Sequence, residues 1–278
     1  MSTYSISAQT QPSAALFLHV GLINPKGALS AVRSILRGMG TKRNLCNKYY
    51  TTSDGFLTEN LRTLLSSHGF VHKPASPQFD RLFRNGTLVY EFPTLQQLWL
   101  HCKEEQTSSV IYMHTLGSHK SWSLRRQFTR RVLQGQVLHG GFEECVDLPG
   151  MWHCGPNPNF SQCWEHYSGF FWRASRAHVK SLREPSLGEA GYTRAMKMGP
   201  GHGDSEMCAP HGPQGRYWAE AWVVHGVSDT SGKRQLTPIR GPGDANAIYR
   251  FVHHLFFTYR VNILHLVDKV AFLFRISW

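Results

Sequence analysis

Strand-like and helix-like segments alternate along most of the chain, from about residue 14 to residue 182, with short connections between many of them. The apolar run Ala15–Val20 predicts a buried strand, and apolar residues within 29–39 recur at helical spacing. The same reasoning predicts further strands at 49–50, 88–92, 109–113 and 167–172, and helices at 56–65, 93–99, 122–138 and 175–182. This alternation favours an α/β fold with a mostly parallel open sheet and helices on both faces.

Other stretches predict no regular structure. Phe70-Val71 is too short for a strand, Pro74–Pro77 predicts a loop, and the segments 145–160 and 188–215 are rich in turn-forming residues. The pattern changes near His225. We therefore expect a single α/β domain over residues 14–225 and a loosely attached, turn-rich and amphipathic tail over residues 226–278.

The charge of the chain bears on the class of its partners. Hydrophobic residues make up 41% of the 278 residues and charged residues 17%, which indicates a folded rather than a disordered chain. The formal net charge of +12 favours anionic partners such as nucleotides, phosphates, nucleic acid or acidic membranes. A basic surface without such a partner is the alternative. No RNA-recognition, zinc-finger or KH signature is present, so nucleic acid is not the favoured partner.

Sequence signals for membranes are weak. The apolar run 14–23 contains His19 and lacks a basic segment before it, so we predict no signal peptide and leave the localisation open. No stretch reaches the roughly 20 apolar residues of a membrane span. The apolar segment 251–278 carries seven charged or histidine side chains, which is typical of an interfacial helix and suggests peripheral membrane contact through the tail.

Metal-binding signals are also weak. His153, Cys154, Cys163 and His166 are the side-chain types that bind zinc, but their spacing fits no common zinc module. Asp-x-Asp, the metal-diphosphate signature of many sugar-nucleotide enzymes, is absent. We therefore predict no cofactor and no metal site, with a divalent ion as the alternative.

The first candidate site follows the strand predicted at 109–113. Ligands of open parallel sheets bind at the carboxyl ends of the strands. We therefore expect His114, Thr115 and Gly117 to line a crevice for a phosphate-bearing substrate. In the alternative interpretation His114 only caps its strand by a hydrogen bond. Arginines on the helix predicted after it either clamp a diphosphate or form a solvated face.

A second candidate cluster combines histidine, serine and aromatic residues at 165–173. His166 is a candidate general base, Ser168 and Gly169 are candidate substrate contacts, and Trp172 could stack on a sugar face. The alternative is an aromatic core strand with a buried histidine.

The third cluster lies at 216–222. Glu220, between two tryptophans that include Trp222, is a second candidate base, and Arg216 is a candidate substrate contact. Arg216 and Glu220 are four residues apart, so a purely structural helical ion pair is the alternative.

Four motifs, taken in order, resemble those of a family of glycosyltransferase-like proteins with a nucleotide-diphospho-sugar transferase (GT-A-like) fold. The chain has Tyr-Glu-Phe-Pro-Thr-Leu at 90–95, Tyr-Met-His-Thr-Leu-Gly at 112–117, His-Tyr-Ser-Gly-Phe-Phe-Trp-Arg at 166–173 and Arg-Tyr-Trp-Ala-Glu-Ala-Trp at 216–222. Leu116, Phe170 and Arg173 depart from the family's Lys, Asn and second Trp. The resemblance covers about residues 14–225.

The resemblance implies an activity and a site. The implied activity is transfer of a sugar from a nucleotide-sugar donor to a glycan or another hydroxyl acceptor. The three departures favour the alternative, a catalytically inert carbohydrate- or nucleotide-binding protein of the same fold. In either case we expect the candidate residues of the three clusters to converge on one crevice.

Overall fold

The apolar run near the N-terminus forms the central strand of the sheet, β1 (Ala14–Gly21), as its pattern predicts. The computed structural model describes residues 14–39, 46–86, 89–105, 107–115, 130, 133–135, 137–138, 153–155, 158–159, 166–167, 171–185, 219 and 222–223. The other strands of the main sheet are β2 (Cys46–Ser53), β3 (Phe70–His72), β4 (Ser109–His114), β5 (His153–Cys154) and β8 (Trp172–Ser175).

The strand order in this sheet is β3-β2-β1-β4-β8-β5. The first four strands are parallel, and β8 runs antiparallel to both of its neighbours. The order 3-2-1-4 belongs to doubly wound sheets, in which the chain first builds outward from β1 on one side and then crosses to the other. The direction of building therefore reverses between β1 and β4, which lie side by side with His19 opposite His114.

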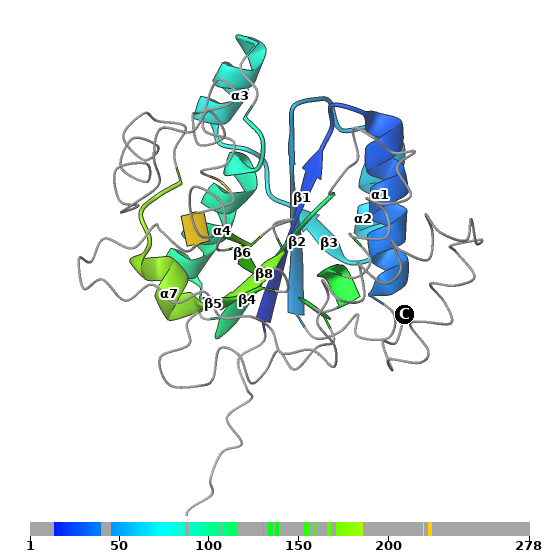
Figure 1. Ribbon diagram of the computed structural model, residues 1–278. Helices are drawn as coiled ribbons and strands as arrows, with labels where there is room; N and C mark the ends of the chain where they lie inside the picture. The colour runs from blue at the N-terminus through cyan, green and yellow to red at the C-terminus, as the bar shows by residue number, and fades with distance from the viewer. Residues whose placement is uncertain are drawn as a thin grey trace, which may run out of the picture.

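Helices cover both faces of the sheet (Figure 1). They are α1 (Pro25–Gly38), α2 (Glu59–Ser67), α3 (Pro77–Arg84), α4 (Phe92–Glu104) and α7 (Arg176–Ser181). Side chains of β1 alternate between the two layers. Leu16, Leu18 and Val20 pack with α1 and α2, whereas Phe17 packs with α4 and α7. The prediction of an α/β fold with a mostly parallel sheet flanked by helices is confirmed.

Local chemistry sets where two helices begin. Asn24 precedes α1, and its side chain accepts a hydrogen bond from the Gly27 amide at 3.0 Å, while Pro25 fills the first helical position. Pro93 occupies the first turn of α4, where a missing N–H costs nothing. The helix α1 therefore begins just beyond the carboxyl end of β1 and leads to β2, and α4 leads to β4.

Several predicted elements differ in the structure. The strand predicted at 88–92 is wrong, because Tyr90 has a φ of 45° and α4 begins at Phe92. The loop predicted at Pro74–Pro77 ends one residue early, since Pro77 begins α3, whose buried residue is Phe79. Phe70–His72 does form a strand, β3, because its backbone pairs in parallel with that of β2.

The strand predicted at 167–172 is divided in the structure. His166–Tyr167 forms β7, which pairs with β6 (Pro158–Asn159) in a separate two-stranded sheet, and Trp172 begins β8 of the main sheet. Both β5 and β6 also lie in the segment 145–160, where only irregular chain is predicted. Of the helix predicted at 122–138, the described residues 130, 133–135 and 137–138 are helical.

Among the described helices, none has the length and apolar character that crossing a membrane requires. The tail at 226–278, with its predicted membrane contact, lies outside the described residues.

Candidate functional site

A buried polar cluster lies at the carboxyl edge of the parallel strands, where the strand order reverses. We call it the switch-point cluster, and its residues are His19 of β1, Ser53 and Asp54 at the end of β2, Glu91 and Thr94 at the start of α4, and His114 and Thr115 at the end of β4. All seven are buried. A buried polar group needs partners, so the cluster is best described by its hydrogen bonds.

A chain of hydrogen bonds runs through His19. Its Nδ1 lies 2.9 Å from the Thr94 hydroxyl and its Nε2 lies 3.4 Å from the Ser53 hydroxyl. The Ser53 hydroxyl donates to the Asp54 carboxylate at 2.8 Å, so the Ser53 oxygen can only accept from His19. This pattern places the imidazole proton on Nε2 and leaves Nδ1 to accept from Thr94. Burial lowers the pKa of His19 to about 4, so the ring is neutral at physiological pH.

Asp54 anchors the loop that leads into α4. One carboxylate oxygen accepts from the Val89 amide at 2.7 Å, and the other accepts from the Tyr90 amide at 3.0 Å. Burial raises the pKa of the Asp54 carboxyl, and the hydrogen bonds from Val89 and Ser53 act in the opposite direction. Asp54 and Tyr90 both have positive φ, at 57° and 45°, a strained conformation outside glycine. Because three donors occupy it, Asp54 holds the loop together.

The end of β4 is joined to β1 and α4. The Thr115 amide donates to the His19 carbonyl at 3.0 Å, and the Thr115 hydroxyl accepts from the Gly21 amide at 3.1 Å. The Nδ1 atom of His114 lies 3.5 Å from a Glu91 carboxylate oxygen, an ion pair when the imidazole is protonated. The carboxylate thus orients the His114 ring, which is how a general base or a hydrogen-bond donor is held in place.

Close packing of two loops supports this edge. A Cβ atom added at Gly55 would lie 2.6 Å from both the Cβ atom and the carbonyl oxygen of Leu22. The Leu22 amide in turn donates to the Ser53 carbonyl at 2.9 Å. The loops that follow β1 and β2 therefore touch, and only glycine fits at position 55 without a shift of the backbone.

The four motifs meet in one series of contacts. Glu91 of the first motif pairs with His114 of the second. Tyr112 of the second stacks on Trp172 of the third, with ring centroids 5.2 Å apart and planes 14° apart. Trp172 in turn lies 6.4 Å from the Trp222 ring of the fourth motif. Segments separated by more than 130 residues of chain thus form one continuous structure.

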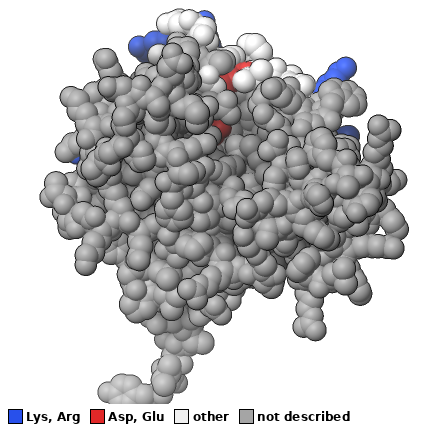
Figure 2. Space-filling view, in the orientation of Figure 1, with Lys and Arg blue, Asp and Glu red and all other residues white. Residues whose placement is uncertain are grey.

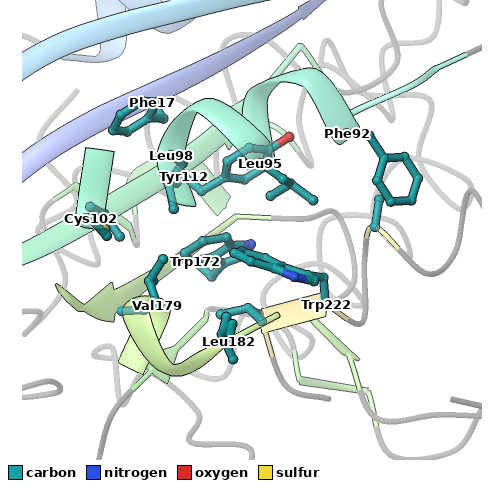
Figure 3. Packing of buried hydrophobic residues seen from close by; sticks show 14 of the residues in the cluster. Phe17, Phe92, Leu95, Leu98, Cys102, Tyr112, Trp172, Val179, Leu182 and Trp222 are labelled. Carbon is teal, nitrogen blue, oxygen red and sulfur yellow. The ribbon is translucent and has the colours of Figure 1, made fainter. Parts of the chain in front are cut away.

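Both tryptophans lie in the hydrophobic core. Trp172 and Trp222 have no exposed surface and pack among residues of α4 and α7 (Figure 3). The Trp222 indole N–H donates to the Arg183 carbonyl at 2.9 Å. The structure gives both rings a packing role, and their contact with substrate stays a prediction.

Arg173 has a structural role. Arg173 of β8 donates from Nε and Nη2 to the Ser109 hydroxyl of β4, at 3.1 and 2.9 Å. The guanidinium bridges the two antiparallel strands. Phe171, beside it in the chain, packs edge to face on the His114 ring with centroids 5.5 Å apart.

The remaining predicted site residues are described only in part. His166 lies in β7, which pairs with β6 in a separate sheet, and its side chain lies outside the described part of the chain. Gly117, Ser168, Gly169, Arg216 and Glu220 are also outside it. The predicted convergence of His114, His166 and Glu220 therefore stays a prediction. Within the described residues, no three His, Cys, Asp or Glu side chains are grouped so that they could hold a metal ion.

Sequence reasoning missed His19, Asp54 and Glu91 as members of one site. His19 is a polar residue inside an apolar strand, and Glu91 stands in a recognised motif, so each carries a signal on its own. Neither signal says that the two lie within one cluster, because only the path of the chain from β3 to the start of α4 brings Glu91 to the carboxyl edge beside β1.

The fold and this cluster define a doubly wound α/β protein with a polar site at its switch point. The chain matches a known family over residues 45–226, more than half of its length, and it belongs to that family, whose description is "Domain of unknown function (DUF8361)". No curated protein and no solved structure matches the chain.

Proposed function

We propose that this chain is a glycosyltransferase-like protein that transfers a sugar from a nucleotide-sugar donor to a hydroxyl group of a glycan or another acceptor. The observation that carries the proposal is that the first two motifs meet at the switch point through Glu91 and His114, with Phe171 of the third motif packed on the His114 ring. The carboxyl edge at a switch point is where open α/β sheets bind nucleotides.

The proposed reaction needs three things from the protein. The donor's diphosphate must be held, the acceptor hydroxyl must lose its proton, and the bond between the sugar's anomeric carbon and the diphosphate must break as the new bond to the acceptor oxygen forms. Arginine side chains and helix N-termini offset the diphosphate charge in this proposal, without a tightly held metal ion. The fold we propose in detail is that of the nucleotide-diphospho-sugar transferases.

The His114–Glu91 pair supplies oriented acid–base chemistry at this edge. A carboxylate beside Nδ1 favours the tautomer with its proton on Nδ1 and fixes the orientation of the ring. His19 cannot share this role, because burial lowers its pKa to about 4 and both of its nitrogens are engaged. We keep His166 and Glu220 as the candidate bases for the acceptor hydroxyl and propose that His114 binds the donor beside them.

A second candidate function is a catalytically inert protein that binds carbohydrate or nucleotide with the same fold. The observation that favours it is the internal bonding of the cluster, in which His19 and Asp54 are each bonded to neighbouring groups of the protein. The bond of Arg173 to Ser109 favours it too, because a residue that departs from the motif has become part of the scaffold.

Thermal-shift measurements with a panel of nucleotide sugars, followed by a donor-hydrolysis assay, separate the two candidates. A glycosyltransferase is stabilised by one donor and turns it over, whereas the inert protein is stabilised without turnover. Glu91→Gln should weaken the response to the donor, and Glu59→Gln, at an exposed position of α2, is the matched control. If no nucleotide sugar stabilises the wild-type chain, the glycosyltransferase proposal is contradicted, and so is the inert protein as a binder of nucleotides.

A further inference from the structure

A basic groove lies between α1 and α2, on the face of the sheet opposite α4, and shares no residue with the switch-point cluster. Its volume is about 710 Å³. The described residues that line it are Lys26, Leu29, Ser30, Arg33, Leu36 and Arg37 of α1 and Leu64 and His68 of α2 and its C-terminal end. None of them is acidic. We call this feature the α1–α2 groove.

The cations of the groove stand in one row. Arg33 and Arg37 follow Lys26 by seven and eleven residues, which are about two and three full turns of an α-helix, so the three lie within roughly 40° of one side of α1. The row is about 16 Å long at 1.5 Å per residue. All three side chains are exposed, and among the described residues none of the three forms an ion pair.

The floor of the groove is apolar. Leu29 and Leu64 are half-buried and pack against the core beneath α1 and α2, and Leu36 is buried. Ile23, immediately before α1, leaves 55% of its surface exposed. A concave surface with an apolar floor and a row of cations that form no ion pair with other described residues is suited to an amphiphile that carries negative charge.

We propose that the α1–α2 groove binds the surface of a membrane that contains anionic phospholipid. Lys26, Arg33 and Arg37 contact the headgroup phosphates, and the half-buried Leu29 and Leu64, together with the exposed Ile23, contact the upper acyl region. A nucleic acid would pair with the cations but leave the leucines exposed, so the apolar floor favours lipid. The formal net charge of +12 acts in the same direction at longer range.

Exposed arginines outside the α1–α2 groove provide a control for the effect of net charge. Where described residues reach the surface in Figure 2, at the upper edge of the view, Lys and Arg flank a mostly uncharged region. Exposed Arg81 and Arg84 lie in the last turn of α3, outside the groove. The variant Arg81→Gln/Arg84→Gln removes the same charge as Arg33→Gln/Arg37→Gln, but from another part of the fold.

Flotation of the full chain with vesicles tests the proposal. We expect binding to vesicles of phosphatidylcholine mixed with phosphatidylserine, and much weaker binding to phosphatidylcholine alone. Each Lys or Arg near an anionic surface contributes roughly fivefold to the partition constant, so Arg33→Gln/Arg37→Gln should reduce it by about 30-fold. Arg81→Gln/Arg84→Gln should reduce it by only about threefold at an ionic strength that screens distant charges.

A further variant tests the floor, and each outcome bears on the proposal. Leu29→Ser, checked for folding by its thermal melt, should weaken vesicle binding yet leave the binding of a single-stranded oligonucleotide unchanged. Equal losses in the two arginine pairs would mean that net charge alone acts and would overturn the proposal. It is also overturned if the wild-type chain does not float with anionic vesicles, or if the groove arginines affect the oligonucleotide and not the vesicles.

Discussion

Replacement of His19 by Asn should change how the stability of the chain depends on pH. Burial lowers the pKa of His19 to about 4 in the folded chain, against an ordinary value of 6.5. The unfolded chain therefore holds a proton on this residue between pH 6.5 and pH 4 that the folded chain does not. Stability contributed by neutral His19 is complete above pH 6.5 and is lost as the pH falls toward 4.

The magnitude follows from the two pKa values. A difference of about 2.5 pH units corresponds to about 3 kcal/mol, lost at close to 1.4 kcal/mol for each unit of pH. Asp54 acts in the opposite sense, because its raised pKa lets the folded chain take up a proton first as the pH falls. The quantity to measure is therefore the difference between wild type and His19→Asn, which removes the other titrating groups from the comparison.

Urea unfolding at several pH values between 7 and 4 measures this difference. At pH 7 we expect His19→Asn to be less stable than wild type, and the gap should shrink by about 3 kcal/mol by pH 4. Thr94→Val is the matched control, since it removes a hydrogen-bond partner of the ring and keeps the ring itself; its gap should stay nearly constant. A gap for His19→Asn that does not change with pH would refute the assignment of a buried neutral histidine.

Three further substitutions test the packing and the anchoring of the site. Gly55→Ala should destabilise the fold by about 2 kcal/mol or more in urea unfolding, because the new Cβ atom would lie 2.6 Å from the Leu22 carbonyl oxygen; an unchanged midpoint contradicts the close approach. Trp172→Ala should cost about 3–5 kcal/mol, measured the same way, because it empties a fully buried site; a loss below about 1 kcal/mol would place the ring outside the core. Asp54→Asn keeps the side-chain shape but turns an amide donor toward backbone N–H groups, so we expect a loss of about 1–3 kcal/mol, against almost none for the exposed Asp80→Asn.

Much of the sheet could be predicted because single segments carry their own signal. The strands β1 and β4 are continuous apolar runs that need no knowledge of their neighbours. The prediction from sequence failed where contacts with distant segments decide the local backbone structure. The pattern at 88–92 has the apolar character of a strand, but the Val89 and Tyr90 amides bond to Asp54, 35 and 36 residues earlier, so they donate to no strand ladder.

The residues of the candidate site likewise fall into those that the sequence predicts and those that it does not. His114 and Thr115 were identified because a strand end is a local feature of the sequence and the carboxyl ends of parallel strands bind ligands. His19, Asp54 and Glu91 were not identified as a group, since their proximity depends on the path of the chain from β3 to the start of α4. For Trp172 the sequence leaves both stacking on a substrate and packing in the core open, and its burial between the sheet and the helices shows the packing role.

By itself, the sequence determined the apolar strands β1 and β4, the basic character of the chain, and the chemistry of the residues at the strand ends, because these follow from local periodicity and side-chain type. The tertiary structure decided the order β3-β2-β1-β4-β8-β5, and with it the meeting of His19, Asp54, Glu91 and His114. Strand order is a matter of contacts between segments far apart in the chain. It fixes which polar side chains lose their water together and must bond to one another, and no single segment contains that information.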